Sequence, residues 1–382
     1  MLSPAIPIGT NSAALQAEWA RPREAASKAD HGLVYCIQPL EDARWERFLE
    51  GHPRASVFHS SPWLKALQRT YGYQPVAYTT SSAVQNLEDA IVFCKVDSWL
   101  TGRRLVSLPF SDHCDPLAGA DDVAVITTRI LQQELSANRW RYVELRPLQP
   151  LEISTQLHRT DVTYAFHQLD LEPDLDTLFH NLHKNSTQRK VRRAEREGLV
   201  YREGTTGEFL DHFYRLFQMT RQRHNVPPQP KRWFANVITC FGDALKIRVV
   251  FAGDRPVAAM ITIRFKETLV YKYGCSDPRF NRLGSMHLLF WRAIQEAKML
   301  GLRSLDFGRT DAGQQGLITF KNRWGATQSV LTYLRYGTEE KSTHFFDLPT
   351  TQWKARATKY ALSCLPSRVV SAVGRVLYRH IG

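Results

Sequence analysis

ALKIRVVFAGDRPVAAMITIRFKETLVYKYG, residues 244–274, is the stretch that decides the fold. It contains three runs rich in apolar and β-branched residues, as strands are. The runs are separated at Gly253-Asp254 and at Lys266-Glu267, where we expect tight turns. The stretch therefore predicts a three-stranded antiparallel meander.

The residues after the meander predict a change in the direction of the chain. Apolar periodicity indicates a long helix from Met286 to Leu300, and Gly301 ends it. A short strand, SLDFG (304–308), and a final strand, SVLTYLRYG (329–337), follow. Antiparallel strands followed by a strand–helix–strand crossover are typical of a mixed sheet with helices on its faces.

The residues before the meander repeat this order of elements, although not the residues themselves. At 382 residues the chain is long enough for two domains. We therefore expect an α/β protein with two tandem units, 33–163 and 164–338, each a mixed, mostly antiparallel sheet flanked by helices. Residues 1–31 predict a loose leader, and residues 339–382 a basic, amphipathic helical tail. Such a tail can rest on an anionic membrane surface or dock on the protein itself, and we favour docking.

The charge of the chain points to anionic partners. It has 50 Lys and Arg residues against 37 Asp and Glu residues, a net charge of +13. Such a surplus favours phosphorylated ligands, nucleic acid or an anionic membrane face. No apolar run is long enough to span a bilayer. The six cysteines are widely spaced without a C-x-x-C pair, so we expect a cytoplasmic protein with neither a metal site nor a disulfide framework.

A basic helix is expected within NLHKNSTQRKVRRAEREGLVYR, residues 181–202, which carries seven basic and two acidic side chains. Arg189, Arg192, Arg193 and Arg196 recur at positions i, i+3, i+4 and i+7, so they share one helical face. Guanidinium groups crowded on one face suit the oxygens of a phosphate. A solvated face without a ligand is an equally good interpretation.

A glycine-bearing loop enters the long helix after the meander. Arg279, Arg282 and Gly284 precede the first helical N–H groups, which lie near Ser285. Backbone N–H groups and the helix dipole make such a terminus suitable for a diphosphate.

Charged residues gather at the end of a short strand in SLDFGRTDAGQQGLITFKNRWGA, residues 304–326. The strand carries Asp306, and Arg309 and Asp311 follow it. The ends of interior strands are where α/β sheets usually place a site. The alternative is that ion pairs of these carboxylates with Arg309 and Arg323 merely pin the loop.

The run His113-Cys114-Asp115 combines residue types found in nucleophilic sites. Adjacent side chains cannot all converge on one point, and the chain contains no G-x-S-x-G elbow. We therefore place no site there.

Together, the basic helix, the glycine loop and the late segment resemble the general N-acetyltransferase (GNAT) superfamily. More narrowly they resemble its Fem-like branch, which includes enzymes that add amino acids to peptidoglycan precursors. The similarity is strongest from STQRKVRRAEREGL (186–199) to the FKNRWGA ending of the late segment. The PPQPKRW bend (227–233) and the LYRHIG ending (377–382) are similar to relatives associated with exopolysaccharide export.

The resemblance implies two tandem GNAT-type domains with the acceptor in the cleft between them. It also implies that Lys321 contacts that acceptor. The acyl donor that the resemblance implies is an acyl-coenzyme A such as acetyl-CoA, or alternatively an aminoacyl-tRNA. The loop NRLGSM (281–286) departs from the GNAT phosphate-loop pattern, and residues 207–241 leave room for only two short helices instead of a long helical arm. The choice of donor therefore stays open.

The resulting hypothesis is an acyltransferase that moves an acetyl, acyl or aminoacyl group onto an amine of a cell-envelope or exopolysaccharide precursor. Asp306 or Asp311 would accept the proton of the amine, and Lys321 or Arg309 would stabilise negative charge. The candidates for the donor's phosphates are Arg279, Arg282, Gly284 and Ser285. The candidates for a phosphorylated or glycan-precursor substrate are Lys184, Arg189, Arg192, Arg193 and Arg323. The competing hypothesis is a non-catalytic protein on a degenerate GNAT scaffold, binding RNA or a membrane surface.

Overall fold

The part of the chain that carries the predicted site is one compact unit, Val34–Gly382. The predicted leader, 1–31, and most of the predicted tail, 339–382, lie outside the described residues. The computed structural model describes the following residues: 33–137, 140–153, 155–337, 373–374 and 376–381.

Local sequence signals account for the elements of the first half. Helix α2 begins after the extended Ser60 with a proline in its first turn, and it ends at Gly72, whose φ of 74° is in the left-handed region. The elements of this half are β1 (Tyr35–Ile37), α1 (Trp45–Gly51), α2 (Ser61–Tyr71), β2 (Gln74–Thr79), β3 (Ile91–Val96), β4 (Arg104–Val106), α3 (Ala120–Arg129), α4 (Leu135–Ala137) and β5 (Tyr142–Leu145).

The predicted meander is confirmed in the second half, where β8, β9 and β10 pair antiparallel around the two expected turns. Gly253 and Lys266 have φ values of 58° and 49° at these turns. The elements of this half are β6 (His158–Asp170), α5 (Leu175–Asn181), α6 (Arg189–Arg196), β7 (Val200–Gly204), α7 (Gly207–Arg223), α8 (Lys231–Phe241), β8 (Leu245–Ala252), β9 (Arg255–Phe265), β10 (Thr268–Ser276), α9 (Ser285–Met299), β11 (Ser304–Asp311), α10 (Gln315–Asn322) and β12 (Thr327–Gly337).

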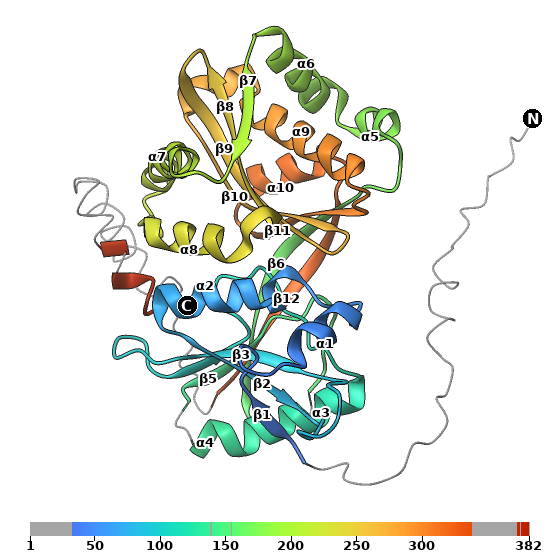
Figure 1. Ribbon diagram of the computed structural model, residues 1–382, viewed down its shortest axis with the longest axis vertical. Helices are drawn as coiled ribbons and strands as arrows, with labels where there is room; N and C mark the ends of the chain where they lie inside the picture. The colour runs from blue at the N-terminus through green and yellow to red at the C-terminus, as the bar shows by residue number, and fades with distance from the viewer. Residues whose placement is uncertain (1–32, 138–139, 154, 338–372, 375, 382) are drawn as a thin grey trace, which may run out of the picture. The chain divides into compact units, whose positions relative to one another are not determined.

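One continuous sheet runs through both halves. Over the described residues it has twelve strands in the order β1-β2-β3-β4-β5-β12-β6-β11-β10-β9-β8-β7. Its centre is the long antiparallel pair β6–β12, whose other edges pair with β11 and β5 (Figure 1). Strand β6 runs across the predicted boundary between residues 163 and 164. The two halves therefore share strands instead of meeting at a linker.

Strands β10 and β11 separate part-way along their length. They pair in parallel from Thr268–Ser304 to Val270–Asp306. Beyond this point β10 continues against β9 and β11 continues against β6, and both ladders shift register there. The separation leaves a wedge between two strands in the interior of the sheet, which side chains from elsewhere must fill.

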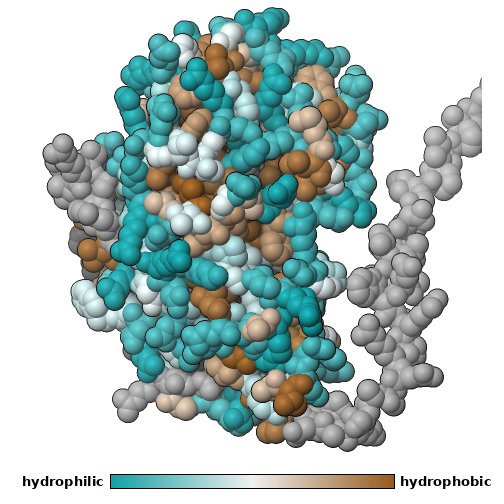
Figure 2. All heavy atoms as spheres, viewed as in Figure 1, coloured by the Kyte–Doolittle hydropathy of each residue, from teal (hydrophilic) through white to brown (hydrophobic). Residues whose placement is uncertain are grey.

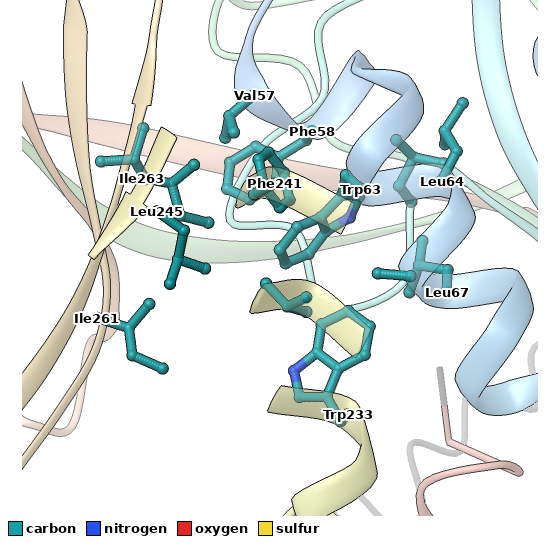
Figure 3. Packing of buried hydrophobic residues seen from close by; sticks show 14 of the residues in the cluster. Val57, Phe58, Trp63, Leu64, Leu67, Trp233, Phe241, Leu245, Ile261 and Ile263 are labelled. Atoms are coloured by element: carbon teal, nitrogen blue, oxygen red, sulfur yellow. The ribbon is translucent and has the colours of Figure 1, made fainter. Parts of the chain in front are cut away.

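The largest apolar core joins the two halves. Helix α2 of the first half packs against α8 of the second, and the rings of Trp63 and Trp233 meet edge to face at 5.3 Å (Figure 3). Both tryptophans are fully buried. Burying a side chain of this size contributes about 3 kcal/mol, so this contact helps to hold the halves together.

The described end of the tail docks on the protein, although not through its valines. Tyr378 and His380 are buried, whereas Val376 is 61% exposed. Tyr73 donates a hydrogen bond from its hydroxyl to the Tyr378 carbonyl at 2.8 Å, and Arg104 donates to the His380 carbonyl at 2.6 Å. Among the helices that the structure describes, none is long and apolar enough to cross a membrane.

Candidate active site

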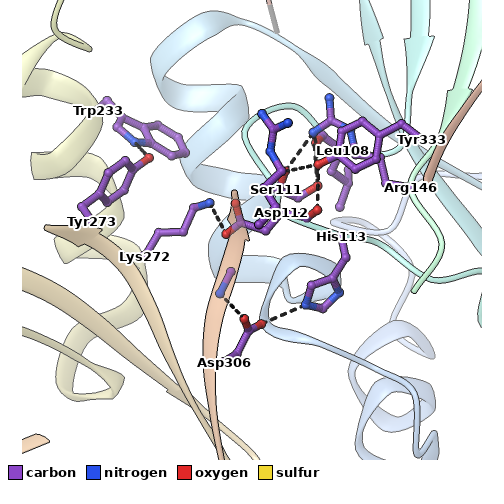
Figure 4. A network of polar contacts seen from close by, with 12 residues as sticks. Leu108, Ser111, Asp112, His113, Arg146, Trp233, Lys272, Tyr273, Asp306 and Tyr333 are labelled. Carbon is purple, nitrogen blue, oxygen red and sulfur yellow. Dashed lines mark hydrogen bonds and ion pairs between the residues drawn. The ribbon is translucent and has the colours of Figure 1, made fainter. Parts of the chain in front are cut away.

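A buried cluster of charged side chains fills the wedge between β10 and β11 (Figure 4). Oδ2 of Asp306, on β11, lies within hydrogen-bond distance of Nε2 of His113, at 3.0 Å. Lys272 of β10 donates from Nζ to Oδ2 of Asp112, at 2.7 Å. His113 and Asp112 belong to the loop that follows β4, so the first half of the chain supplies one partner of each pair.

This loop is fixed by hydrogen bonds to its backbone. The hydroxyl of Tyr333, on β12, donates to the Asp112 carbonyl at 2.7 Å. Arg146 donates from Nη1 to the carbonyls of Leu108 and Ser111, at 2.6 and 3.0 Å. The carbonyls that turn inward are thereby satisfied, which lets a loop enter the interior without a large free-energy penalty.

Burial and pairing oppose each other at the Lys272–Asp112 pair. Burial lowers the pKa of Lys272 below its usual value, even though the Asp112 carboxylate opposes this. Burial alone would raise the pKa of Asp112, but the ammonium of Lys272, together with the charges of Arg309 and Lys321, lowers that pKa. Each charge of the pair is therefore stabilised by the other inside the protein.

Lys321 holds the backbone of β11 just beyond Asp306. Its Nζ donates to the carbonyls of Gly308 and Arg309, at 2.8 and 3.2 Å, and its side chain is buried. Burial lowers the pKa of Lys321 to about 8. Gly308 has a φ of 69°, and a Cβ there would lie 3.0 Å from Oδ2 of Asp112, so the cluster requires glycine at this position.

Arg309 extends from the cluster towards the surface. Its guanidinium lies over the rings of Tyr164 and Tyr333, 4.1 and 5.2 Å from their centroids. Its Nη1 is buried without a hydrogen-bond partner, and the carboxylate of Asp311 lies 4.0 Å away, beyond hydrogen-bond distance. A charged donor is therefore available for a ligand.

Three of the four predicted catalytic residues meet at one place. Asp306, Arg309 and Lys321 surround Gly308. Asp311 does not join them: its side chain is 59% exposed and accepts a hydrogen bond from the amide of the nearby Gln314.

The basic helix and the glycine loop meet in a second place. Residues of α6 and Arg282 line a hollow of about 730 Å³. Around α6 the surface is mainly hydrophilic (Figure 2). Val191 and Ala194 are buried on the opposite side of the helix, as the pattern predicts. The residues that line the hollow are Arg189, Lys190, Arg193, Arg196, Glu197 and Arg282.

The N-terminus of α9 is covered instead of open. Gly284 has a φ of 81°, and a side chain there would run into the backbone carbonyl of Lys190 on α6. Ser285 is buried beside it, and its hydroxyl has no hydrogen-bond partner. Arg279 forms a two-point ion pair with Asp277. Arg279, Gly284 and Ser285 do not line the hollow. The phosphate-binding role predicted for them therefore stays a prediction.

The remaining candidates lie outside both places. Lys184 and Arg323 are exposed. Arg192 lies over the ring of Phe179, 5.2 Å from its centroid, and does not line the hollow. Within the part of the chain that the structure describes, no group of three or more His, Cys, Asp or Glu side chains could hold a metal ion.

Sequence reasoning missed Asp112, His113 and Lys272. His113 belongs to the run that we set aside because neighbouring side chains cannot converge on one point, and Asp112 directly precedes that run. They do not converge: each reaches a different strand. Cys114, in the same run, is buried, and burial raises the pKa of its thiol to about 12, so it is not the nucleophile. The signal that could have found Asp112 and His113 is the run of polar residues that begins at Ser111, in the loop after β4.

Part of the chain matches a known domain family. The profile of the acetyltransferase (GNAT) domain matches residues 182–322, which hold the hollow, the parting strands and Lys321. Residues 182–322 are therefore similar to a GNAT domain. A UDP-N-acetylmuramoylpentapeptide-lysine N(6)-alanyltransferase of Weissella viridescens is 24% identical over 105 residues. That match covers 27% of this chain and 31% of the alanyltransferase, so the chain aligns with about a third of its relative.

Solved structures support the predicted α/β class with two GNAT-like units. The crystal structure of FemX has a TM-score of 0.58 at 12% identity, over 78% of this chain and 96% of its own. A tandem GNAT protein from the clavulanic acid biosynthesis pathway has a TM-score of 0.50 at 10% identity, over 81% and 99%. At these identities the likeness concerns the fold alone.

Proposed function

We propose that this chain is an N-acyltransferase that moves an acetyl, acyl or aminoacyl group onto an amine of a cell-envelope or exopolysaccharide precursor. The observation that carries the proposal is the parting of β10 and β11, inside a GNAT domain, around a buried cluster with a free cationic donor. The Weissella relative, named as an alanyltransferase acting on a lysine amine, supports the same reaction class.

The reaction needs a donor for the oxyanion that forms when the amine attacks the acyl carbonyl. Arg309 supplies this donor through Nη1, which has no hydrogen bond in the protein. Lys321 uses two of its three N–H groups on the carbonyls of Gly308 and Arg309, so the third is left for the acceptor. In this proposal Lys321 fixes the strand that carries Arg309 and touches the acceptor.

The phosphates of the donor bind in the hollow on α6. Its lining carries five cationic side chains against one carboxylate, that of Glu197, which Arg193 engages at 3.0 Å. Near the N-terminus of α9, the centroid of the His287 ring lies 5.4 Å from that of Phe320 on α10. It lies 5.9 Å from that of Trp324, which follows α10. The hollow and the helix that bears Lys321 are thereby joined through α9.

Transfer assays with the full chain test the proposal. Labelled acetyl-coenzyme A and labelled alanyl-tRNA are each offered with the UDP-linked pentapeptide and with amino sugars as acceptors. We expect transfer from one donor, and a loss of about 100- to 1,000-fold in kcat for Arg309→Gln, the range for one oxyanion donor. Arg215→Gln, on the exposed face of α7, is the matched control. Absence of transfer from both donors would refute the proposed function.

The hollow has its own test. Arg189→Gln combined with Arg282→Gln should raise the KM for the donor and leave the melting temperature near that of the wild type. If the donor is a tRNA, its affinity should also fall steeply with salt, and less steeply in the variant. Unchanged donor KM in the double variant would remove the hollow from the proposal.

A further inference from the structure

One atom of the buried cluster has no partner in the protein. The ring of His113 is 5% exposed, and its Nε2 is bound to Asp306, yet its Nδ1 is buried without a hydrogen bond. Phe58 and Phe166 meet the ring edge to face, at centroid distances of 5.1 and 5.4 Å. The ring is thus held in one orientation, and a buried polar atom of a fixed ring calls for a partner.

The hydrogen bonds determine which ring nitrogen carries the proton. Oδ1 of Asp306 accepts the Gly308 N–H at 2.6 Å, and Oδ2 faces Nε2 of His113 at 3.0 Å. A carboxylate only accepts hydrogen bonds, so Nε2 carries the proton and Nδ1 presents a lone pair.

We propose that His113 is the general base of the transfer and that Asp306 is its positioning residue; this rests on the proposed acyltransferase function. The substrate it takes is a neutral primary amine. The nitrogen of the amine bonds to the acyl carbon and releases a proton to Nδ1 of His113. The bond from the acyl carbon to the leaving oxygen or sulfur breaks, and that atom takes the proton from His113. An amide and a protonated leaving group result, and the imidazole returns to its starting form.

The carboxylates are less suitable as the direct base. Both oxygens of Asp306 are occupied, one by Gly308 and one by His113, and the side chain is buried. Asp311 is largely exposed and lies outside the cluster. A base needs a free acceptor atom for the proton that it takes, and Nδ1 of His113 is such an atom because it has no hydrogen-bond partner in the protein.

The surroundings of His113 contain few groups that titrate. His59 lies near it, and burial lowers the pKa of His59 to about 4, so that ring is neutral near pH 7. Asp306 faces it from β11. Lys272 on β10 and Lys321 on α10 interact electrostatically with Asp306. A pH profile of the reaction can therefore be tied to His113 by substitution.

Two measurements test the inference. The first is the ¹⁵N spectrum of the histidine rings in the wild-type full chain, with His113→Gln to assign the signals. We expect a proton on Nε2 and none on Nδ1 of His113. The opposite tautomer would overturn the inference whether or not transfer is observed. The tautomer is read from the wild-type chain, so the result does not depend on how a variant folds.

The second measurement is the pH dependence of kcat for wild type, His113→Gln and Asp306→Asn, with His212→Gln on α7 as the matched control. We expect His113→Gln to lose about 100- to 10,000-fold in kcat, to keep the donor KM within about threefold, and to lose the acid limb of the profile. Asp306→Asn should also lower kcat and shift the tautomer. If wild type transfers and His113→Gln transfers equally with its acid limb intact, the inference is overturned. If wild type does not transfer at all, it is the proposed function that fails.

Discussion

Replacing Lys321 with methionine should change how the stability of the protein depends on pH. Burial lowers the pKa of Lys321 from 10.5 to about 8. Below pH 8 the amine is charged in both the folded and the unfolded chain, and folding must bury that charge. Between pH 8 and 10.5 the folded chain has lost this proton while the unfolded chain still holds it. The unfolded state then binds more protons, so the free energy of unfolding rises with pH.

The size of the effect follows from the difference in pKa. Each pKa unit is worth about 1.4 kcal/mol, and 10.5 − 8 is about 2.5 units, so the full contribution is about 3.5 kcal/mol. Most of it, about 2 to 3 kcal/mol, falls between pH 7 and pH 10. Wild type should gain this amount relative to Lys321→Met over that range. The variant also loses the hydrogen bonds of Lys321 to the two carbonyls. This loss changes the free energy of unfolding of the variant by an amount that does not depend on pH.

Urea unfolding at pH 7, 8.5 and 10, followed by tryptophan fluorescence, measures the difference. Lys65→Met, which removes an exposed lysine of α2, is the control for general effects of alkali. A difference between wild type and Lys321→Met that stays constant, or shrinks, from pH 7 to pH 10 would show that Lys321 is not desolvated as described.

Three further outcomes are expected. Gly284→Ala should cost about 1 to 3 kcal/mol in thermal unfolding, because its φ is 81° and the new Cβ would meet the carbonyl of Lys190. Lys272→Met should cost about 3 to 5 kcal/mol by leaving Asp112 buried and unpaired, and adding Asp112→Asn should restore part of it; equal costs for the single and double variants would contradict the pairing. Acyl transfer should decline above about pH 8 as Lys321 loses its charge, and in Lys321→Arg the decline should move to higher pH.

The order of the elements could be predicted because its signals are local. Turn residues at Gly253 and Lys266, and the glycine after the helix at Gly301, act within a few residues of themselves. The contact between Lys321 and the carbonyl of Gly308 also joins residues only 13 positions apart. Sequence reasoning therefore found this part of the site as a single segment.

The other half of the site could not be predicted in this way. His113 and Asp306 are 193 positions apart, and Asp112 and Lys272 are 160 apart. No periodicity or spacing reports such a contact, because it depends on two strands parting and on a distant loop entering between them. The expected boundary at residue 163 likewise overlooked that one long strand, β6, runs across it.

The sequence by itself determined the class of the fold, the meander, the basic face of α6 and the segment that bears Asp306, Arg309 and Lys321. Each of these depends on backbone preference or side-chain periodicity over a short stretch. Only the tertiary structure decided that Asp306 faces a histidine and that the glycine loop lies under α6. Burial and electrostatic partnership arise when distant segments exclude water together, and the ionisation of the site is therefore a property of the folded chain.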